Sequence, residues 1–160
     1  MTRPRKIMPC LWFDFNAEEA VAHYLSIFGD GRVVSKTYYG EAGPGPAGAV
    51  MTILFEIEGE EFLAVNGGPQ FKFTPAISLV VNCETQDEVD AMWDKLSEGG
   101  SRHPCGWLTD RFGVSWQIVP RALPEMLQSA DAKRSQRAMR ALLGMEKIDI
   151  AQLQQAIGPN

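Results

Sequence analysis

The pattern of apolar and polar positions occurs twice along the chain. An apolar segment at residues 7–15 predicts a strand. A polar cap follows, and then apolar residues recur at helical spacing: Ala20, Val21, Tyr24, Leu25 and Phe28. The same order returns after Pro75, where Ile77, Leu79 and Val81 alternate with Ser78, Val80 and Asn82, as in a strand. A second helical pattern follows, carried by Val89, Met92, Trp93 and Leu96.

A constant offset of 69 residues relates the two halves. It relates Asn16 to Thr85, the expected helix caps, and Glu19 to Glu88, the carboxylates that complete a capping box. It also relates core and stop positions: Tyr24 with Trp93, Ile27 with Leu96, and Gly31 with Gly100. The sequence therefore predicts an internal duplication.

Strand-like segments follow each predicted helix. They lie at 32–39, 49–58 and 61–66 in the first half, and at 101–108 and 114–119 in the second. The predicted fold is α+β, with a first βαβββ module at 1–70 and a second at 71–122. Residues 123–160 form a helical C-terminal extension, with helices at 123–130, 131–144 and 150–157.

One face of the second predicted tail helix is basic. It carries Lys133, Arg134, Arg137 and Arg140. Such a face is either solvated or meets an acidic partner, and we expect solvation.

The composition and charge of the chain exclude several classes of protein. A net charge of −5 argues against a nucleic-acid partner. No apolar run is long enough for a membrane span, and the N-terminus does not read as a signal peptide. Three cysteines without paired spacing indicate reduced thiols. We expect a cytoplasmic protein without a membrane or nucleic-acid partner.

Three stretches resemble a known family. They are residues 66–75 (NGGPQFKFTP), 105–117 (CGWLTDRFGVSWQ) and 145–149 (MEKID). With the duplicated module, they are similar to the PhnB-like subfamily, labelled "3-demethylubiquinone-9 3-methyltransferase-like", of the vicinal oxygen chelate superfamily. The superfamily includes glyoxalase I, bleomycin-resistance proteins and extradiol dioxygenases. The resemblance implies curved sheets around a cavity, commonly in a homodimer.

The same resemblance implies a metal held by His or carboxylate residues on the first and last strands of each module, and here the chain departs from it. Asp110 and Gly113 match the glyoxalase pattern, but its Glu position is Gln117. The first strands hold no His, Asp or Glu, and the last strand of module one offers only Asn66. We expect no metal and no other cofactor, with a divalent cation as the alternative.

The methyltransferase label is disfavoured on different grounds. Enzymes that use S-adenosylmethionine in an open α/β sheet bind it at a Gly-rich turn between a strand and a helix. Gly29, Gly31 and the pair at 99–100 instead follow helices, where helix-ending glycines belong.

Polar residues on the predicted strands are candidates for ligand binding. Alternation puts Ser115 with Gln117, and Ser78 with Asn82, on faces turned away from the apolar core. Together with Asn66 and Trp107, they can line a cavity and bind a small molecule through hydrogen bonds and ring stacking. The alternatives are a structural amide at Gln117 and core or dimer-interface packing at Trp107.

Cys105 is the candidate nucleophile. A reactive thiolate needs a base or a positive charge nearby, and His103 lies two residues away, on the same face of a continuous strand. The alternative is a small packing residue beside Gly106.

Two functions follow from these features. The first is a metal-free protein that binds a small apolar or aromatic molecule in the sheet cavity. The second is a metal-dependent lyase, isomerase or dioxygenase of the superfamily. The missing ligand set favours the first.

Overall fold

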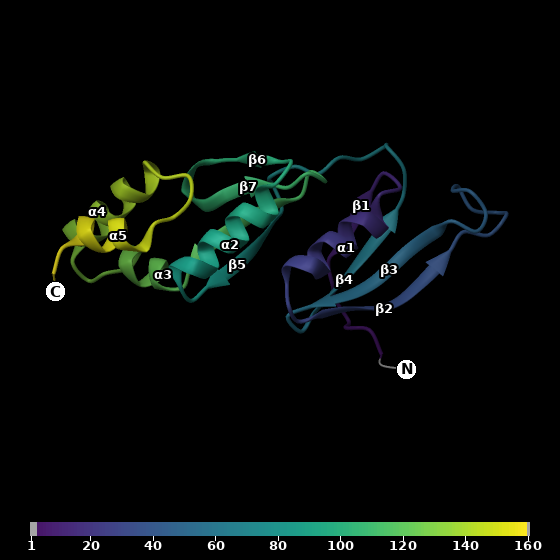
Figure 1. The fold of residues 1–160 in the computed structure, drawn as a ribbon, viewed down its shortest axis with the longest axis horizontal. Coiled ribbons are helices and arrows are strands. Elements are labelled where there is room, and N and C mark those ends of the chain that lie inside the picture. Colours follow the sequence, from purple (N-terminus) through teal and green to yellow (C-terminus); the bar gives the residue numbers. More distant parts are fainter. Residues whose placement is uncertain (1–2, 160) are drawn as a thin grey trace. The chain divides into compact units, whose positions relative to one another are not determined.

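The computed structural model describes residues 3–159 and divides the chain into two compact units, 1–73 and 74–160 (Figure 1). Each unit has its own mixed sheet of four strands. The described part of the chain has no helix that is both long and apolar enough to span a lipid bilayer.

Unit 1 is a βαβββ module. Its elements are β1 (Cys10–Phe13), α1 (Ala17–Ile27), β2 (Gly31–Tyr38), β3 (Val50–Ile57) and β4 (Glu60–Asn66). The strand order is β1-β4-β3-β2, in which β1 runs parallel to β4 and the other pairs are antiparallel. Helix α1 packs on β3 and β4, burying Tyr24 against a core that includes Phe13, Ile53 and Phe55.

The N-terminus of α1 differs from the sequence-based expectation. Asn16 is the N-cap residue, but its side chain makes no capping hydrogen bond. The side chain of Asn66, at the end of β4, accepts a hydrogen bond from the Ala17 N–H at 3.0 Å. A residue distant in the sequence therefore satisfies the first backbone N–H of the helix, one of the donors that have no partner within the helix.

Unit 2 repeats the module. It contains β5 (Ser78–Cys83), α2 (Gln86–Ser97), β6 (Ser101–Arg102), β7 (Trp107–Thr109) and β8 (Ser115–Pro120), in the sheet order β5-β8-β7-β6. Helix α2 begins as predicted: the Thr85 side chain accepts from the Glu88 N–H, and the Glu88 carboxylate accepts from the Glu84 N–H.

The predicted strand at 101–108 is interrupted. A single 3₁₀ turn, η1 (Pro104–Gly106), separates β6 from β7. Cys105 and Gly106 both have left-handed backbone conformations, with φ of 64° and 80°. This conformation cannot continue a strand, so the chain bends between His103 and Trp107.

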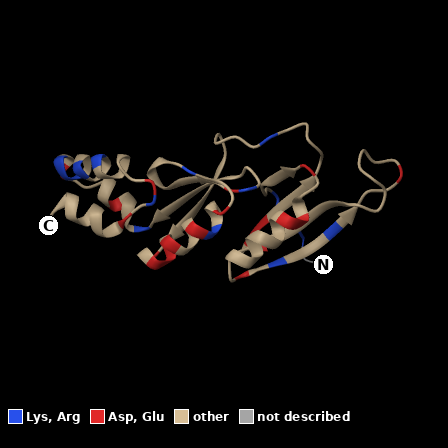
Figure 2. Ribbon diagram, turned by 45° about the horizontal axis from the view of Figure 1, so that its top comes forward, with Lys and Arg blue, Asp and Glu red and all other residues tan. Residues whose placement is uncertain are grey.

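The helical C-terminal extension is confirmed as α3 (Ala122–Leu127), α4 (Ala132–Leu143) and α5 (Ile150–Ile157). Its helices pack around a separate core of Leu123, Leu142, Ile148 and Leu153. Figure 2 shows the basic residues along α4, near the C-terminal end of the chain. One of them is structural, because the Arg137 guanidinium donates to the Ala156 and Ile157 carbonyls at the end of α5.

Candidate functional site

One face of the unit 2 sheet collects most of the predicted ligand-binding residues. The opposite face packs against α2 and buries Leu108, Trp116 and Ile118. Because side chains alternate along a strand, the residues between these point to the other side. The strand register arranges them in two rows. The first holds Ser78, Ser115, Thr109 and Ser101, and the second holds Val80, Gln117, Trp107 and His103.

We call these two rows, together with Asn82, the open face. Asn82 follows Val80 on β5, and its cross-strand neighbour Val119 packs against the core of the C-terminal extension. The extension therefore borders the open face at this end.

Hydrogen bonds support this assignment of the rows. The Gln117 amide nitrogen donates to the Ser78 hydroxyl at 2.9 Å, which places both side chains on the same side of the sheet. His103 Nε2 lies 3.0 Å from the Thr109 hydroxyl oxygen. The His103 N–H donates to the Trp107 carbonyl at 2.9 Å, which places His103 beside Trp107 across the η1 bend.

The strand positions of the open face carry no formal charge. None of its positions holds Asp, Glu, Lys or Arg. Its centre is partly apolar: Val80 is 51% exposed and Trp107 is half-buried. An accessible sheet face that combines an aromatic ring, an aliphatic side chain and neutral hydrogen-bonding groups matches the composition of small-molecule sites.

Five of the predicted ligand-binding residues thus lie on one face: Ser78, Asn82, Ser115, Gln117 and Trp107. Ser115 is buried, whereas Asn82 is exposed. The sequence-based list omitted Ser101, Val80 and Thr109. Val80 alternates with Ser78 and Asn82 along β5, so the sequence already placed it on this face. Thr109 and Ser101 are identified by the register of β7 against β8 and of β6 against β7, which becomes visible only once the η1 bend is placed.

Asn66 lies elsewhere, in unit 1, and is buried at 3% exposure. Its amide oxygen accepts from the Ala17 N–H, and its amide nitrogen donates to the Val50 carbonyl, each at 3.0 Å. Its own carbonyl accepts from the Tyr39 hydroxyl at 2.6 Å. The side chain of Asn66 therefore has a structural role in unit 1.

The thiol of Cys105 and the imidazole of His103 do not form a pair. The η1 bend turns Cys105 toward the C-terminal extension, where its Sγ lies 3.7 Å from the Leu142 carbonyl oxygen and packs against the helical core. His103 instead contacts Thr109. The expectation that both residues point to one face assumed a continuous strand, which the left-handed Cys105 backbone interrupts.

The other two cysteines are not alike. Cys10 is exposed, although partial burial of its thiol raises its pKa. Cys83 is buried, and this burial, with a smaller contribution from Glu88, raises its pKa to about 11. The Cys83 thiol is therefore protonated at neutral pH and a poor nucleophile.

The side chains available to bind a metal ion do not match the His and carboxylate ligands that the resemblance to the superfamily implies. Within residues 3–159, no group of three or more His, Cys, Asp or Glu side chains is placed to hold a metal ion. Asp110, which matched the glyoxalase pattern, is buried, and its carboxylate accepts from the Phe112 and Val114 N–H groups and from the Trp116 indole. The open face offers hydroxyls, amides and a single imidazole, a set unlike the imidazole and carboxylate ligands of Zn²⁺ or Fe²⁺.

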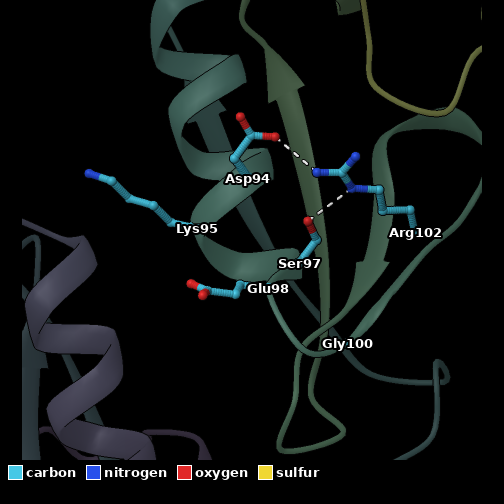
Figure 3. Close-up of a pocket in the computed structure, with 6 residues that line it drawn as sticks. All are labelled: Asp94, Lys95, Ser97, Glu98, Gly100 and Arg102. Carbon is cyan, nitrogen blue, oxygen red and sulfur yellow. Dashed lines mark hydrogen bonds and ion pairs between the residues drawn. The ribbon is translucent and has the colours of Figure 1, made fainter.

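A hollow of about 600 Å³ lies at the C-terminal end of α2 (Figure 3). Its lining residues are Asp94, Lys95, Ser97, Glu98, Gly100 and Arg102. The Arg102 guanidinium bonds to Asp94 at 2.9 Å and to Ser97 at 3.1 Å, so the charges within this hollow are partly paired with one another. It contains none of the predicted ligand-binding residues.

Comparison with known proteins places the chain in a family. The family model described as 3-demethylubiquinone-9 3-methyltransferase matches residues 5–119. The structure of a PhnB protein from Bacillus cereus is 38% identical, with a TM-score of 0.66 over 72% of this chain and 99% of that one. No curated protein shows significant sequence similarity.

Two other solved structures resemble the fold. A protein from Pseudomonas aeruginosa is 25% identical, with a TM-score of 0.61 over 73% of this chain and 98% of that one. The fosfomycin resistance protein FosX from Listeria monocytogenes, solved with Mn(II) and sulfate, is 14% identical, with a TM-score of 0.55 over 79% of this chain and all of that one. At this identity, FosX shows the fold alone.

Proposed function

The chain belongs to the family described as 3-demethylubiquinone-9 3-methyltransferase, with the glyoxalase/bleomycin-resistance fold, and we propose that it binds a small, uncharged, aromatic or apolar molecule on the open face of unit 2. The observation that carries the proposal is the row Val80–Gln117–Trp107, in register across three strands and free of charged side chains.

The chemistry of the two rows indicates the class of ligand. Val80 and the Trp107 ring offer an apolar surface for a planar molecule. The amide of Gln117 and the hydroxyls of Ser78 and Thr109 offer neutral hydrogen bonds, which suit a hydroxyl or carbonyl group on that molecule. A ligand with a net charge would find no opposite charge among the strand residues of this face, and its desolvation would go uncompensated.

Methyl transfer, the activity named in the family description, finds no support in the way the strands connect to the helices. The connection from β1 to α1 is Asp14, Phe15 and Asn16, and that from β5 to α2 is Glu84 and Thr85. Neither contains the glycines that let a backbone approach a nucleotide at a helix N-terminus.

The test is calorimetric titration with 2-naphthol, an uncharged aromatic alcohol. Val80→Lys places a flexible charged chain on the open face, whereas Val33→Lys makes the same change at a similarly exposed strand position in unit 1, where Val33 is 41% exposed. We expect wild type and Val33→Lys to bind alike, and Val80→Lys to bind at least about tenfold more weakly.

Equal affinities of the two valine variants, or a wild-type protein that does not bind the probe, would overturn the proposal. Adding Mn²⁺, Ni²⁺, Zn²⁺ or Fe²⁺ to the same titration addresses the alternative function. A metal-dependent enzyme requires one of these ions to bind and to change the affinity or the stability, and we expect neither change.

A further inference from the structure

The turn between β6 and β7 is held by main-chain bonds from the C-terminal extension. The N–H of Cys105 donates to the Met145 carbonyl, and the N–H of Gly106 donates to the Glu146 carbonyl, both at 2.8 Å. On the other side of the turn, the Cys105 thiol lies against the Leu142 carbonyl. The residues that make these contacts, Leu142, Met145 and Glu146, all follow β8, the last strand of the sheet. The contacts therefore come from the C-terminal extension and not from the βαβββ module.

The turn fits tightly against the loop that follows α4. A methyl group added at Gly106 would lie 2.7 Å from the Ile118 carbonyl oxygen and 2.8 Å from Cδ1 of Ile148. Ile148 is fully buried and belongs to the helical core of the extension. Cys105 has a left-handed backbone conformation that is unfavourable for a residue with a side chain, so the turn depends on these contacts.

Gln86 fixes the same loop from the side of α2. Its amide nitrogen donates to the Ile148 carbonyl at 3.0 Å, and its amide oxygen accepts from the Ile150 N–H at 2.8 Å. A second link joins Lys147 to Asp90 at 3.0 Å. One side chain thus bridges the first turns of α2 and α5 and holds Ile148 between them.

We propose that Gln86 and Ile148 are positioning residues for the open face: through the η1 turn, they determine where His103 and Trp107 lie. His103 and Trp107 immediately flank η1, so any displacement of the turn moves these two neighbouring residues, which form one end of the second row of the open face. The expected effect of these residues on ligand binding rests on the proposed function. Their expected effect on the position of Trp107 does not.

Two conservative substitutions test the proposal. Ile148→Val removes only the Cδ1 methyl, which is the side-chain atom closest to the site of an added Gly106 methyl. Gln86→Leu keeps the approximate size of the side chain and removes its amide. The matched controls are Ile157→Val, buried in α5, and Gln155→Leu, exposed on α5.

Two measurements are made on each full-length variant. The first is ¹⁹F NMR of protein labelled with 5-fluorotryptophan, with the Trp107 signal assigned by Trp107→Phe. The second is calorimetric titration with 2-naphthol. We expect Ile148→Val and Gln86→Leu to shift or broaden the Trp107 signal and to weaken binding about fivefold, whereas both controls leave the signal and the affinity unchanged.

The outcomes separate the two proposals. An unchanged Trp107 signal and affinity in Ile148→Val and Gln86→Leu would show that these residues serve stability alone, and would overturn the positioning role. A wild-type protein that fails to bind 2-naphthol would overturn the proposed function, while the Trp107 signal would still decide whether the extension positions the turn.

Discussion

At the scale of single residues, Asn66 shows how a polar side chain on a strand can serve the fold instead of a ligand. Its amide uses both of its polar atoms inside unit 1, on the Ala17 N–H and the Val50 carbonyl. These bonds join the end of β4 to the start of α1 and to β3. A buried amide with this pattern stabilises the module, because each backbone group that it satisfies would otherwise be left without a partner.

We therefore expect Asn66→Ala to lower the free energy of unfolding by about 2 kcal/mol, because it leaves a buried donor and a buried acceptor unsatisfied. The control is Asn16→Ala, at an N-cap residue whose side chain makes no capping bond. It should cost less than about 0.5 kcal/mol. Urea denaturation of both variants measures the difference, and equal losses would contradict the role given to Asn66.

At the scale of elements, the contact between α2 and the loop before α5 includes an ion pair between Asp90 and Lys147, and we expect its strength to depend on pH. Hydrogen bonds from Gln86 and Lys147 hold the pKa of Asp90 below its ordinary value. A lowered pKa in the folded state means that ionised Asp90 stabilises the fold above the unfolded pKa of about 4. This contribution is lost as the pH falls through the lowered value.

Comparing wild type with Asp90→Asn tests this dependence. Because the Asp90–Lys147 pair is half-exposed, solvent screens it, and at pH 7 we expect wild type to be more stable by about 0.5 kcal/mol or less. The difference should shrink as the pH falls below about 4. Thermal unfolding at several pH values measures it, and a difference that stays constant down to pH 2 would count against the assignment.

At the scale of the whole molecule, the chain consists of two βαβββ modules and a helical addition that the family model does not cover. Each module keeps its own sheet and its own helix core. The addition has a third core and reaches back to η1 and α2. The resemblance implies a homodimer, and we keep this as a proposal for the intact protein.

Native mass spectrometry of protein purified without chelators or added metals tests the proposal for the assembly. We expect twice the chain mass, with no stoichiometric metal, because the open face lacks the usual ligands for one. A monomer would contradict the dimer. A dimer that carries one metal per chain would contradict the metal-free reading and favour the enzyme alternative.

The sequence by itself determined the elements and their order. Helix stops and core spacings depend on neighbours within a few residues. The duplicated pattern therefore predicted α1 and α2, and the local pattern of residues 123–160 predicted the three tail helices. Strand alternation likewise placed Ser78 with Asn82 and Ser115 with Gln117 on faces turned away from the core. These are local properties, which can be inferred from residues close together in the sequence without knowledge of the tertiary contacts.

Only the tertiary structure decided which of these residues meet. The register between strands put Gln117 between Val80 and Trp107, and contacts from residues some 40 positions away bent the chain at Cys105 and separated it from His103. The same kind of distant contact made Asn66, rather than Asn16, the partner of the α1 N-terminus. Such outcomes depend on packing between segments far apart in the chain, which local spacing does not encode.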